Sequence, residues 1–480
     1  MTGPVPSPAL PPWDSLGPMA RSSVEAERVG PYLALLFLML SSATLFEGFD
    51  AAMLSFAAPE ARAALDIDRE EWGYVNGITR MGVMASFFFL FFADRFGRRS
   101  MMMLTVLGFT LFNGLTAFVT DKWQFTACQT LARLFLTAEY SLAVIMVGEE
   151  FPARLRARAI AILISLATVG VMAMAKLQPY VLLAEGAEAN WLHDLGAYLV
   201  ATGQAGLGLP RDGGSWRALY ALSLLPLALI LLLRLGMRET RRFEAARAEG
   251  PAPRRSFREV LHDAAVPWRP EYRARTAMVT LLWNCVFLVT APSVVYWVIF
   301  AREDVGLTPA QVGDIVFWGY GGGVAGHFVA GWLIDRVGRK RTCAGFYVAG
   351  AVSIAMLYQV PSLPGQYGWM VATVFSFAAA NTATYVYASE LFPTEIRATG
   401  YGWTTNLAGR VTEVTTPMAI GALSVYLGIP NSIAVVAVGP ILGAALVLRY
   451  APETRGMTLE EIEEALGGRA PRVAPVAAEP

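Results

Sequence analysis

Charged side chains are scarce in this chain. Only 16% of its 480 residues are Asp, Glu, Lys or Arg, whereas 55% are hydrophobic. A soluble chain of this length normally carries more charge, and many runs here reach the roughly 20 apolar residues that cross a bilayer. The runs are continuously apolar rather than alternating, which argues against a membrane β-barrel. The composition therefore predicts an all-α polytopic membrane protein.

Cysteines and recognisable catalytic motifs are also few. The three cysteines, Cys128, Cys285 and Cys343, all fall inside apolar runs, so a disulfide framework is not expected. The chain shows no Walker motif, metal-ligand cluster or catalytic triad, and the glycines of 321–326 lie within an apolar run, where small residues let helices approach. We expect no enzyme, cofactor, metal site or ATP-driven pump. The formal net charge is zero, so no nucleic-acid partner is expected.

The sequence does contain a repeat of two loop motifs. Asp94 to Arg99 closes one apolar run and Asp335 to Lys340 closes another, with an offset of 335 − 94 = 241. Glu149 to Arg156 matches Glu390 to Arg397 with the same offset, 390 − 149 = 241. Equal spacing of two separate motifs indicates an internal duplication.

The duplication divides twelve predicted membrane spans into two pseudo-symmetric six-helix bundles. The predicted spans are 31–57, 73–93, 101–120, 125–148, 157–183, 215–236, 276–300, 310–334, 342–360, 367–389, 399–422 and 428–449. We expect a disordered tail at 1–29, a first bundle at 30–237, a linker at 238–274, a second bundle at 275–450 and a tail at 451–480.

The first half is longer between its fifth and sixth spans. Glu239 after span six corresponds to Glu453 after span twelve, and 453 − 239 = 214 falls 27 short of the offset of 241. Residues 184–214, with Trp191 and His193, are therefore an extra extracytoplasmic segment. A lid is one interpretation, and a tolerated surface insertion is the favoured one.

Basic residues predict the orientation. Arginines and lysines gather in the loops after spans two, four and eight, whereas the first loop, on the opposite side, is acidic around Asp66 to Glu71. The positive-inside rule then places both termini on the cytoplasmic side of the membrane. We expect this membrane to be a bacterial inner or plasma membrane.

The two halves with these loops resemble the major facilitator superfamily over about residues 31–462. Gly331 to Lys340 matches that superfamily's loop motif in full, whereas the first copy has Leu90 in place of the leading Gly. The Glu-x6-Arg motifs of both halves and Pro452 to Gly456 resemble the sugar-porter branch and its organic-acid relatives. The resemblance implies a major facilitator fold of 12 transmembrane helices.

Spans one and eleven narrow the resemblance further. Phe46 to Asp50 is similar to the Asp-Gly-x-Asp motif of aromatic-acid:proton symporters, with Glu47 in place of the first Asp. Gly402-Trp403, followed by Arg410 and Pro417, also resembles that branch, although Thr412 stands where the branch usually has Gly.

Acidic residues in span one are the candidate proton-coupling groups. Glu47 and Asp50 are three residues apart and share a helix face. When two carboxylates are partly removed from water on one face, the pKa of at least one is raised. Such a group can take up a proton on one side of the membrane and release it on the other. In the sugar-porter branch an Asp of span one pairs with an Arg of span four, and Asp50 and Arg133 match those positions. The alternative is a purely structural helix-helix clamp.

Other polar groups inside the spans are candidates for substrate binding. Arg133, Lys176 and Arg410 favour an anion, although Lys176 can equally reach the interface and Arg410 can neutralise Glu413 one turn away. Arg80 is expected to face water or pair with Glu47. The remaining candidates are the hydrogen-bonding side chains Asn284, Asn381 and Tyr385, the aromatic residues Trp283, Tyr296, Trp297, Phe317 and Trp318, and His327, which is favoured as a packing residue.

The resemblance also implies a role for the charged loops. In the superfamily such residues clamp the two halves when the cavity opens outward, and they separate when it opens inward. The residues at matching positions are Asp94, Arg95, Arg98, Glu149, Arg156, Asp335, Arg336, Arg339, Glu390 and Arg397.

These observations predict a secondary active transporter that works by alternating access. The favoured activity is proton-coupled symport of a small organic acid, a class that includes aromatic acids. The alternatives are a proton:sugar or polyol symporter, an efflux carrier, and a transporter-like receptor that moves no solute. The expected partners are a small-molecule substrate, H⁺ and the lipid bilayer, and a monomer is expected.

Overall fold

Long apolar runs fold as long helices, because a helix satisfies its own backbone hydrogen bonds out of contact with water. The structure, a computed structural model, describes residues 31–89, 96–183, 186, 188–209, 214–234, 239, 265–392, 396–457 and 461–462. Within these residues the predicted spans fall largely on helix, although 117–120 of span three and 181–183 of span five are not helical. Six stretches of them are long and apolar enough to cross a membrane, by length and composition.

The described residues of the first half contain six long helices and one shorter one. Asp121 begins α6 by accepting hydrogen bonds from the backbone N–H groups of Trp123 and Gln124. The helices are α2 (Pro31–Ala64), α3 (Arg69–Phe89), α5 (Arg98–Thr116), α6 (Lys122–Glu150), α7 (Ala153–Leu177), α8 (Trp191–Gly206) and α9 (Ser215–Arg234).

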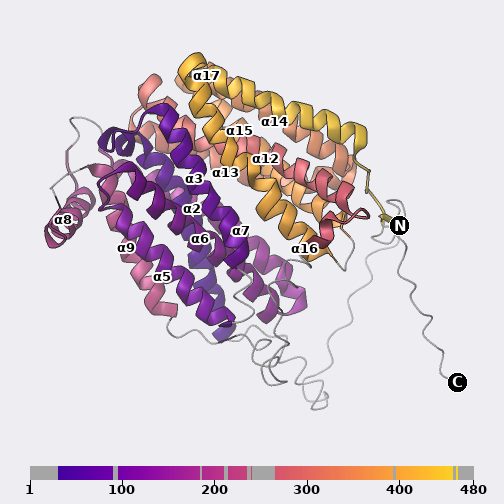
Figure 1. Cartoon of the computed structure of the whole chain (residues 1–480), viewed down its shortest axis with the longest axis horizontal. Helices are drawn as coiled ribbons and strands as arrows, with labels where there is room; N and C mark the ends of the chain where they lie inside the picture. Colours follow the sequence, from indigo (N-terminus) through magenta and orange to yellow (C-terminus); the bar gives the residue numbers. More distant parts are fainter. Residues whose placement is uncertain are drawn as a thin grey trace, which may run out of the picture.

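The extra segment of the first half contains a helix, α8, within its described residues. Its helix α8 begins at Asn190, whose side chain accepts from the N–H groups of Leu192 and His193, and it packs against α9. In Figure 1, α8 lies at the edge of the molecule, outside the bundle. The segment is therefore an added helix on the first bundle.

The second half repeats this arrangement with one interruption. The predicted start of span eight is confirmed, since Thr308 and Gln311 form a capping box with Pro309 at the first turn. The elements are η4 (Val266–Trp268), α12 (Arg273–Ile299), the π-helix η5 (Phe300–Asp304), α13 (Pro309–Val337), α14 (Arg339–Gln359), α15 (Leu363–Glu390), α16 (Arg397–Gly402), the π-helix η6 (Trp403–Leu407), the 3-10 helix η7 (Ala408–Arg410) and α17 (Val411–Tyr450).

Span eleven is not the continuous α-helix that the sequence predicts. It passes through α16, η6 and η7 before α17 begins, so the backbone is π- and 3-10-helical from Trp403 to Arg410. Gly428, with φ of 72°, bends the chain inside α17 and separates spans eleven and twelve. Breaks of this kind free backbone groups within the membrane and are common at transporter binding sites.

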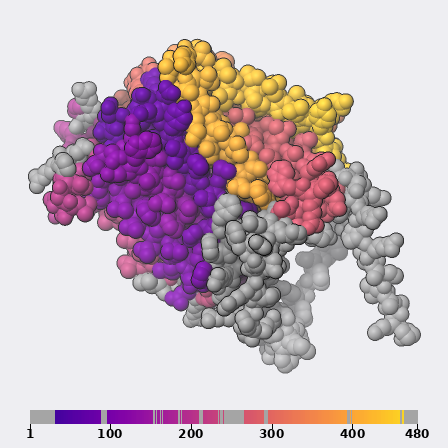
Figure 2. All heavy atoms as spheres, viewed as in Figure 1, coloured from indigo at the N-terminus to yellow at the C-terminus, as the bar shows by residue number. Residues whose placement is uncertain are grey.

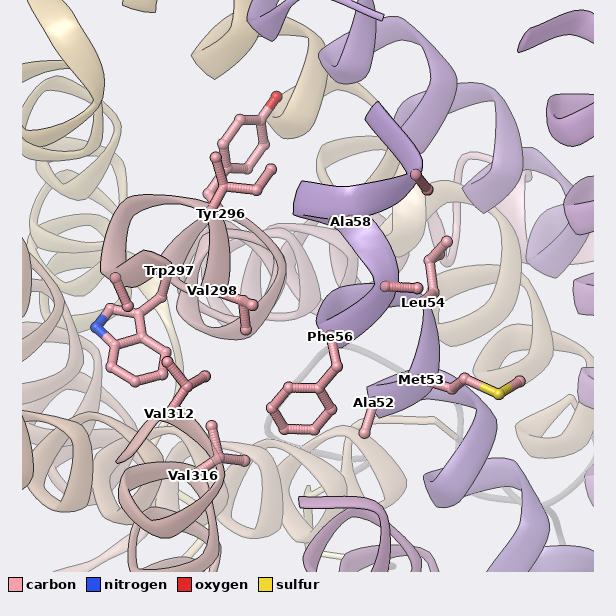
Figure 3. Close-up of a cluster of buried hydrophobic side chains, with 14 of the residues drawn as sticks. Ala52, Met53, Leu54, Phe56, Ala58, Tyr296, Trp297, Val298, Val312 and Val316 are labelled. Atoms are coloured by element: carbon pink, nitrogen blue, oxygen red, sulfur yellow. The ribbon is translucent and has the colours of Figure 1, made fainter. Parts of the chain in front are cut away.

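The two halves lie side by side, and one hydrophobic core joins them (Figure 1). This core includes the ends of α2, α3 and α7 from the first half and the adjoining parts of α12, α13 and α17 from the second. Figure 3 shows Phe56 of α2 pointing toward Val298 of α12 and Val316 of α13. We call the end of the molecule built around 52–75, 171–182 and 296–316 the joined end.

The opposite end has separate cores. One cluster is drawn only from the first half, around Met102 and Met146. Another is drawn only from the second half, around Cys343 and Tyr387. We call this end, which carries the loops around Arg98 and Arg339, the motif end. The space-filling view shows the halves meeting along a boundary between α3 and α17 (Figure 2).

Candidate functional site

Close packing of α2 against α7 positions the acidic face of α2. A Cβ on Gly48 would lie 1.7 Å from the carbonyl oxygen of Ala167, and a Cβ on Gly170 would lie 1.9 Å from that of Leu45. Only glycine permits such backbone contact. The opposite face of α2, with Glu47 and Asp50, is thereby held toward α6 and the second half.

Asp50 and Arg133 form a buried ion pair between α2 and α6. Oδ2 of Asp50 lies 3.5 Å from Nη2 of Arg133, and their side chains are only 3% and 5% exposed. The pairing expected from the resemblance is therefore present, whereas its part in proton coupling stays a prediction. Nε and Nη2 of Arg133 find no hydrogen-bond acceptor among the described residues. Part of this guanidinium is free to bind another oxygen.

Glu47 lies near this pair but makes no ion pair of its own within the part of the chain that the structure describes. It is within electrostatic range of Arg133 on α6 and of Arg410 in the second half. Tyr140 on α6 also lies close to both Glu47 and Arg410. Glu47 thus faces the boundary between the two halves.

A second buried ion cluster crosses that boundary. Glu413 on α17 accepts from Nη1 of Arg80 at 2.7 Å and from Nη1 of Arg410 at 2.6 Å. Its side chain is 5% exposed, and those of Arg80 and Arg410 are 15% and 19% exposed. The predicted neutralisation of Arg410 by Glu413 is confirmed, but the predicted pairing of Arg80 with Glu47 is wrong. Arg80 instead reaches the second half because α3 packs on α17.

Glu139 has a buried partner that sequence reasoning missed. Arg234, in the last turn of α9, donates to Glu139 on α6 and to the carbonyl oxygen of Met39 at 3.0 Å. The signal was an arginine at the end of an apolar run, a position more often taken by interface residues. This pair lies within the first half.

Arg410 lies beside an aromatic ring of the second half, from which a group of further rings continues. Its guanidinium lies 4.9 Å from the ring centre of Phe287, and Trp283 stacks on that ring at 5.7 Å. Tyr385 meets Trp283 edge-on at 4.6 Å, and Tyr401 lies 6.1 Å from Tyr385. Phe287 and Tyr401 were missed in the sequence, although Phe287 follows Trp283 by one helical turn. A cation beside several rings suits a planar anion.

The side chain of Asn284 hydrogen-bonds the backbone of span eleven. Its side-chain amide donates to the carbonyl oxygen of Ala408, and its oxygen accepts from the N–H of Thr412 at 3.1 Å. These bonds satisfy backbone groups released where span eleven is broken. A role for Asn284 as a cavity hydrogen-bonder stays a prediction, at an amide that already bonds these backbone groups. Asn381, one helical turn before Tyr385 on α15, is partly buried.

Lys176 is also placed differently from the prediction. Its ammonium pairs with Asp314 on α13 and lies 4.6 Å from the ring centre of Phe317. Both side chains are about half exposed, at 49% and 46%. Lys176 therefore links the two halves at the joined end rather than adding a cation beside Arg133.

Two further aromatic candidates, Tyr296 and Trp297, are buried packing residues. Tyr296 donates to the carbonyl oxygen of Pro417 at 2.7 Å, and Trp297 donates to Gln366 at 2.7 Å. Trp318 is 58% exposed. His327 contacts the hydroxyl of Thr382 at 2.6 Å, as expected for a packing histidine.

At the motif end, the two copies of the loop motif form equivalent ion pairs. Arg98 binds Glu149 at 2.9 Å, and Arg339 binds Glu390 at 2.8 Å. The repeat extends to the N–H groups of both arginines, which donate to Glu239 and Glu453, each at 2.9 Å. These described pairs each lie within one half.

The other motif residues are less enclosed or lie outside the described structure. Asp335 is 78% exposed and lies 3.6 Å from Arg339, whereas Arg336 covers the ring of Trp332 at 4.3 Å. Asp94 and Arg95 lie outside the described residues. The side chains of Arg156 and Arg397 do so as well, although both residues are placed on helices.

Ion pairs at the joined end connect the two halves, and sequence reasoning missed them. Arg62 binds Glu303 at 2.6 Å, and Arg69 binds Glu303 at 3.1 Å and Asp304 at 2.9 Å. A further pair, Arg302 with Glu60, is 3.1 Å long. The available signal was the duplication itself, since 303 − 62 = 241.

Comparison with known proteins gives concordant matches. The family profile described as Sugar (and other) transporter matches residues 37–466. The chain is 26% identical over 452 residues to a gallate transporter of Pseudomonas putida, covering 88% of this chain and 93% of that protein. It is 23% identical over 464 residues to the niacin transporter NiaP of Acinetobacter baylyi, covering 92% and 99%. A crystal structure of a D-xylose-proton symporter superposes with a TM-score of 0.68 at 17% identity, covering 89% and 100%.

Proposed function

Because this chain belongs to the sugar (and other) transporter family of the major facilitator superfamily, we propose that it carries out proton-coupled symport of a small aromatic acid. The family and the relatives are transporters, so the chain is a multi-pass membrane transporter and not an enzyme.

The single observation that carries the substrate class is the aromatic setting of Arg410. A guanidinium offers paired donors to a carboxylate, and rings on the same side offer faces and edges to an aromatic ring. Phe287 lies beside Arg410, and Trp283, Tyr385 and Tyr401 continue the group. Gallate and niacin, named for two relatives, are both aromatic carboxylic acids.

Buried acids on α2 support proton coupling. Asp50 faces Arg133 at 3.5 Å with both side chains almost fully enclosed, and Glu47 lies beside them. Neutralising a buried acid leaves positive charge on the nearby guanidiniums uncompensated and so favours another anion. Proton uptake and carboxylate binding are thereby linked. The D-xylose-proton symporter of the same fold provides a precedent for proton coupling.

The orientation follows from the charged loops. If the arginine-rich motif end faces the cytoplasm, the joined end faces the outside, and the described conformation is closed to the outside. Ion pairs such as Arg62 with Glu303, together with the shared hydrophobic core, then form the outer gate.

A proton:sugar symporter is the second candidate, supported by the family's name and by the xylose symporter. Sugars are usually held by side-chain amides and hydroxyls. Here the amide of Asn284 is used by the backbone of Ala408 and Thr412. The aromatic-acid proposal accounts better for Arg410.

Uptake by purified protein in proteoliposomes tests the proposal. With the lumen made alkaline, 4-hydroxybenzoate, nicotinate, gallate, succinate and D-xylose are offered separately. We expect an aromatic carboxylate to accumulate above equilibrium and to leave again when a protonophore is added. Accumulation of D-xylose alone would favour the sugar alternative. Binding without flux would indicate a receptor. Export of substrate from loaded vesicles in exchange for entering protons would indicate an efflux carrier.

A further inference from the structure

The charged side chains at the boundary between the halves balance one another. Three carboxylates and three guanidiniums lie within electrostatic range of their neighbours in one connected set. This set, which we call the central charge cluster, consists of Glu47, Asp50 and Glu413 with Arg80, Arg133 and Arg410. With all six ionised, its net charge is 3 − 3 = 0.

Contacts within the cluster are unequal. Asp50 is occupied by Arg133, whereas Glu413 alone serves both Arg80 and Arg410. The two arginines around Glu413 therefore carry one positive charge more than their shared partner neutralises. Nε of each arginine has no hydrogen-bond acceptor among the described residues.

Glu47 balances that surplus from a distance. It is the acid of the cluster with no ion pair in the described structure, and it lies in range of Arg410. A proton entering a buried cluster goes to the carboxylate whose charge is least compensated by direct partners. By contact geometry, that carboxylate is Glu47.

Other groups near Glu47 do not change the count. Arg133, Glu139 and Tyr140 face it from α6, and Tyr385 faces it from α15. Glu139 is neutralised by Arg234 of α9. The helices α7 and α12, which also pack on α2, carry charged residues only near their ends.

We propose that Arg80, Glu413 and Arg410 form a carboxylate site shared by the two halves, in which Glu413 sets the charge so that one monocarboxylate binds for each proton on Glu47. This inference rests on the proposed symport and adds its stoichiometry and its anion site. Proton and carboxylate enter together as a neutral pair, so transport is electroneutral. A dicarboxylate would leave a buried negative charge and is disfavoured.

Separate imposed gradients test the stoichiometry. Proteoliposomes containing the full chain are given 4-hydroxybenzoate or nicotinate under a pH gradient with no membrane potential, or under a K⁺ diffusion potential with no pH gradient. The proposal predicts accumulation under the pH gradient and none under the potential alone. Accumulation driven by an inside-negative potential would overturn the 1:1 ratio and leave proton symport standing. Absence of flux under both gradients would overturn both proposals.

Glu413→Gln tests the anion site. The variant cluster is positive without a proton, so the carboxylate binds unaccompanied. We expect the half-saturation concentration to lose its rise with pH, which one-proton linkage allows to reach about tenfold per pH unit. Uptake should also become sensitive to potential. The double variant Glu413→Gln with Arg80→Gln restores neutrality and is expected to recover the pH dependence, at a higher half-saturation concentration because Arg80 is lost from the site.

Matched variants guard against misfolding and local damage. Glu71→Gln removes one carboxylate from an ion pair with Lys122 within the first half and is expected to leave coupling unchanged. If Glu413→Gln is not recovered as a monodisperse protein, Glu47→Gln makes the same change in net charge from the first half. Wild-type pH dependence in a neutralised variant that folds would refute the charge-balance account.

Discussion

The joined end and the motif end use the same kinds of side chain in different ways. At the joined end, the partners come from different halves, as in Arg62 with Glu303 and Arg302 with Glu60. At the motif end, the described pairs, such as Arg98 with Glu149, come from the same half. One end therefore resists separation of the halves, whereas the other stiffens each half by itself.

Hydrophobic packing follows the same division. The core at the joined end includes residues from both halves, whereas the clusters at the motif end are drawn from one half each. Toward the motif end the halves still touch through Phe87 and Trp403, whose rings are 6.2 Å apart. Under the proposed alternating access, the joined end must lose its contacts between the halves, and the motif end must gain contacts of that kind.

The largest expected effect comes from a wedge at the joined end. A Cβ on Gly73 of α3 would lie 2.6 Å from the carbonyl oxygen of Pro417 on α17. Gly73→Trp should therefore force α3 and α17 apart, favour the opposite conformation and reduce transport by more than about tenfold, a shift of ~1.4 kcal/mol. Electron–electron distances between spin labels at Trp123 and Leu363, both exposed near the joined end, should lengthen.

Gly331→Trp is the matched control for the wedge. A Cβ on Gly331, near the motif end, would meet nothing within 4 Å. The same bulky substitution there should leave the label distance at the joined end unchanged. An unchanged distance in Gly73→Trp would show that this contact does not hold the halves.

The next largest effect should come from reversing a charge at the joined end. Arg62→Glu places two acids together where Arg62 now binds Glu303, and it should shift the conformational equilibrium by about 1–3 kcal/mol. Adding Glu303→Arg should restore the pair and most of the shift. A double-mutant cycle on the label distances gives the coupling. Additive effects of the two reversals would exclude a direct interaction.

A smaller effect is expected at the motif end. Arg339 binds Glu390 through both Nε and Nη2, a fork that lysine cannot reproduce. Arg339→Lys should slow transport several-fold while leaving substrate affinity nearly unchanged. Arg98→Lys, the equivalent change in the first half, should do the same. Flux measured at saturating substrate gives the transport rate, and tryptophan fluorescence gives the substrate affinity. A loss of affinity equal to the loss of flux would argue against gating.

The smallest effect should come from Asp335→Asn. Asp335 is 78% exposed and lies 3.6 Å from Arg339, so the present pair contributes at most about 1 kcal/mol. Any slowing of transport should exceed the weakening of binding, because the residue is expected to act mainly in the other conformation. Equal changes in both, measured as above, would remove Asp335 from the gate.

Helix positions and the buried acids were predictable from the sequence, because apolar run length and internal repetition are local properties. Thr308 and Pro309 likewise predicted the start of α13 correctly. Asp50 and Arg133 were paired by resemblance, and the structure places them together. These residues lie within one half, where the duplication and the family motif constrain the partners.

Partners across the halves were not predictable in the same way. Glu413 binds Arg80, which is 333 positions away in the chain, and Lys176 binds Asp314. A periodic pattern shows that a charge is buried, but it does not show which helix of the other half it meets. The backbone contacts of Asn284 were missed for a related reason, since the break in span eleven where they lie has no clear sequence signature.

Asp50→Asn provides the most direct test of coupling through the buried acids of α2. In proteoliposomes, the account predicts that a pH gradient no longer drives accumulation of the aromatic carboxylate, while exchange of labelled for unlabelled substrate continues. Exchange reports an intact site and working halves, so the two readings on one preparation separate coupling from damage. Gradient-driven accumulation that persists in Asp50→Asn would contradict the account.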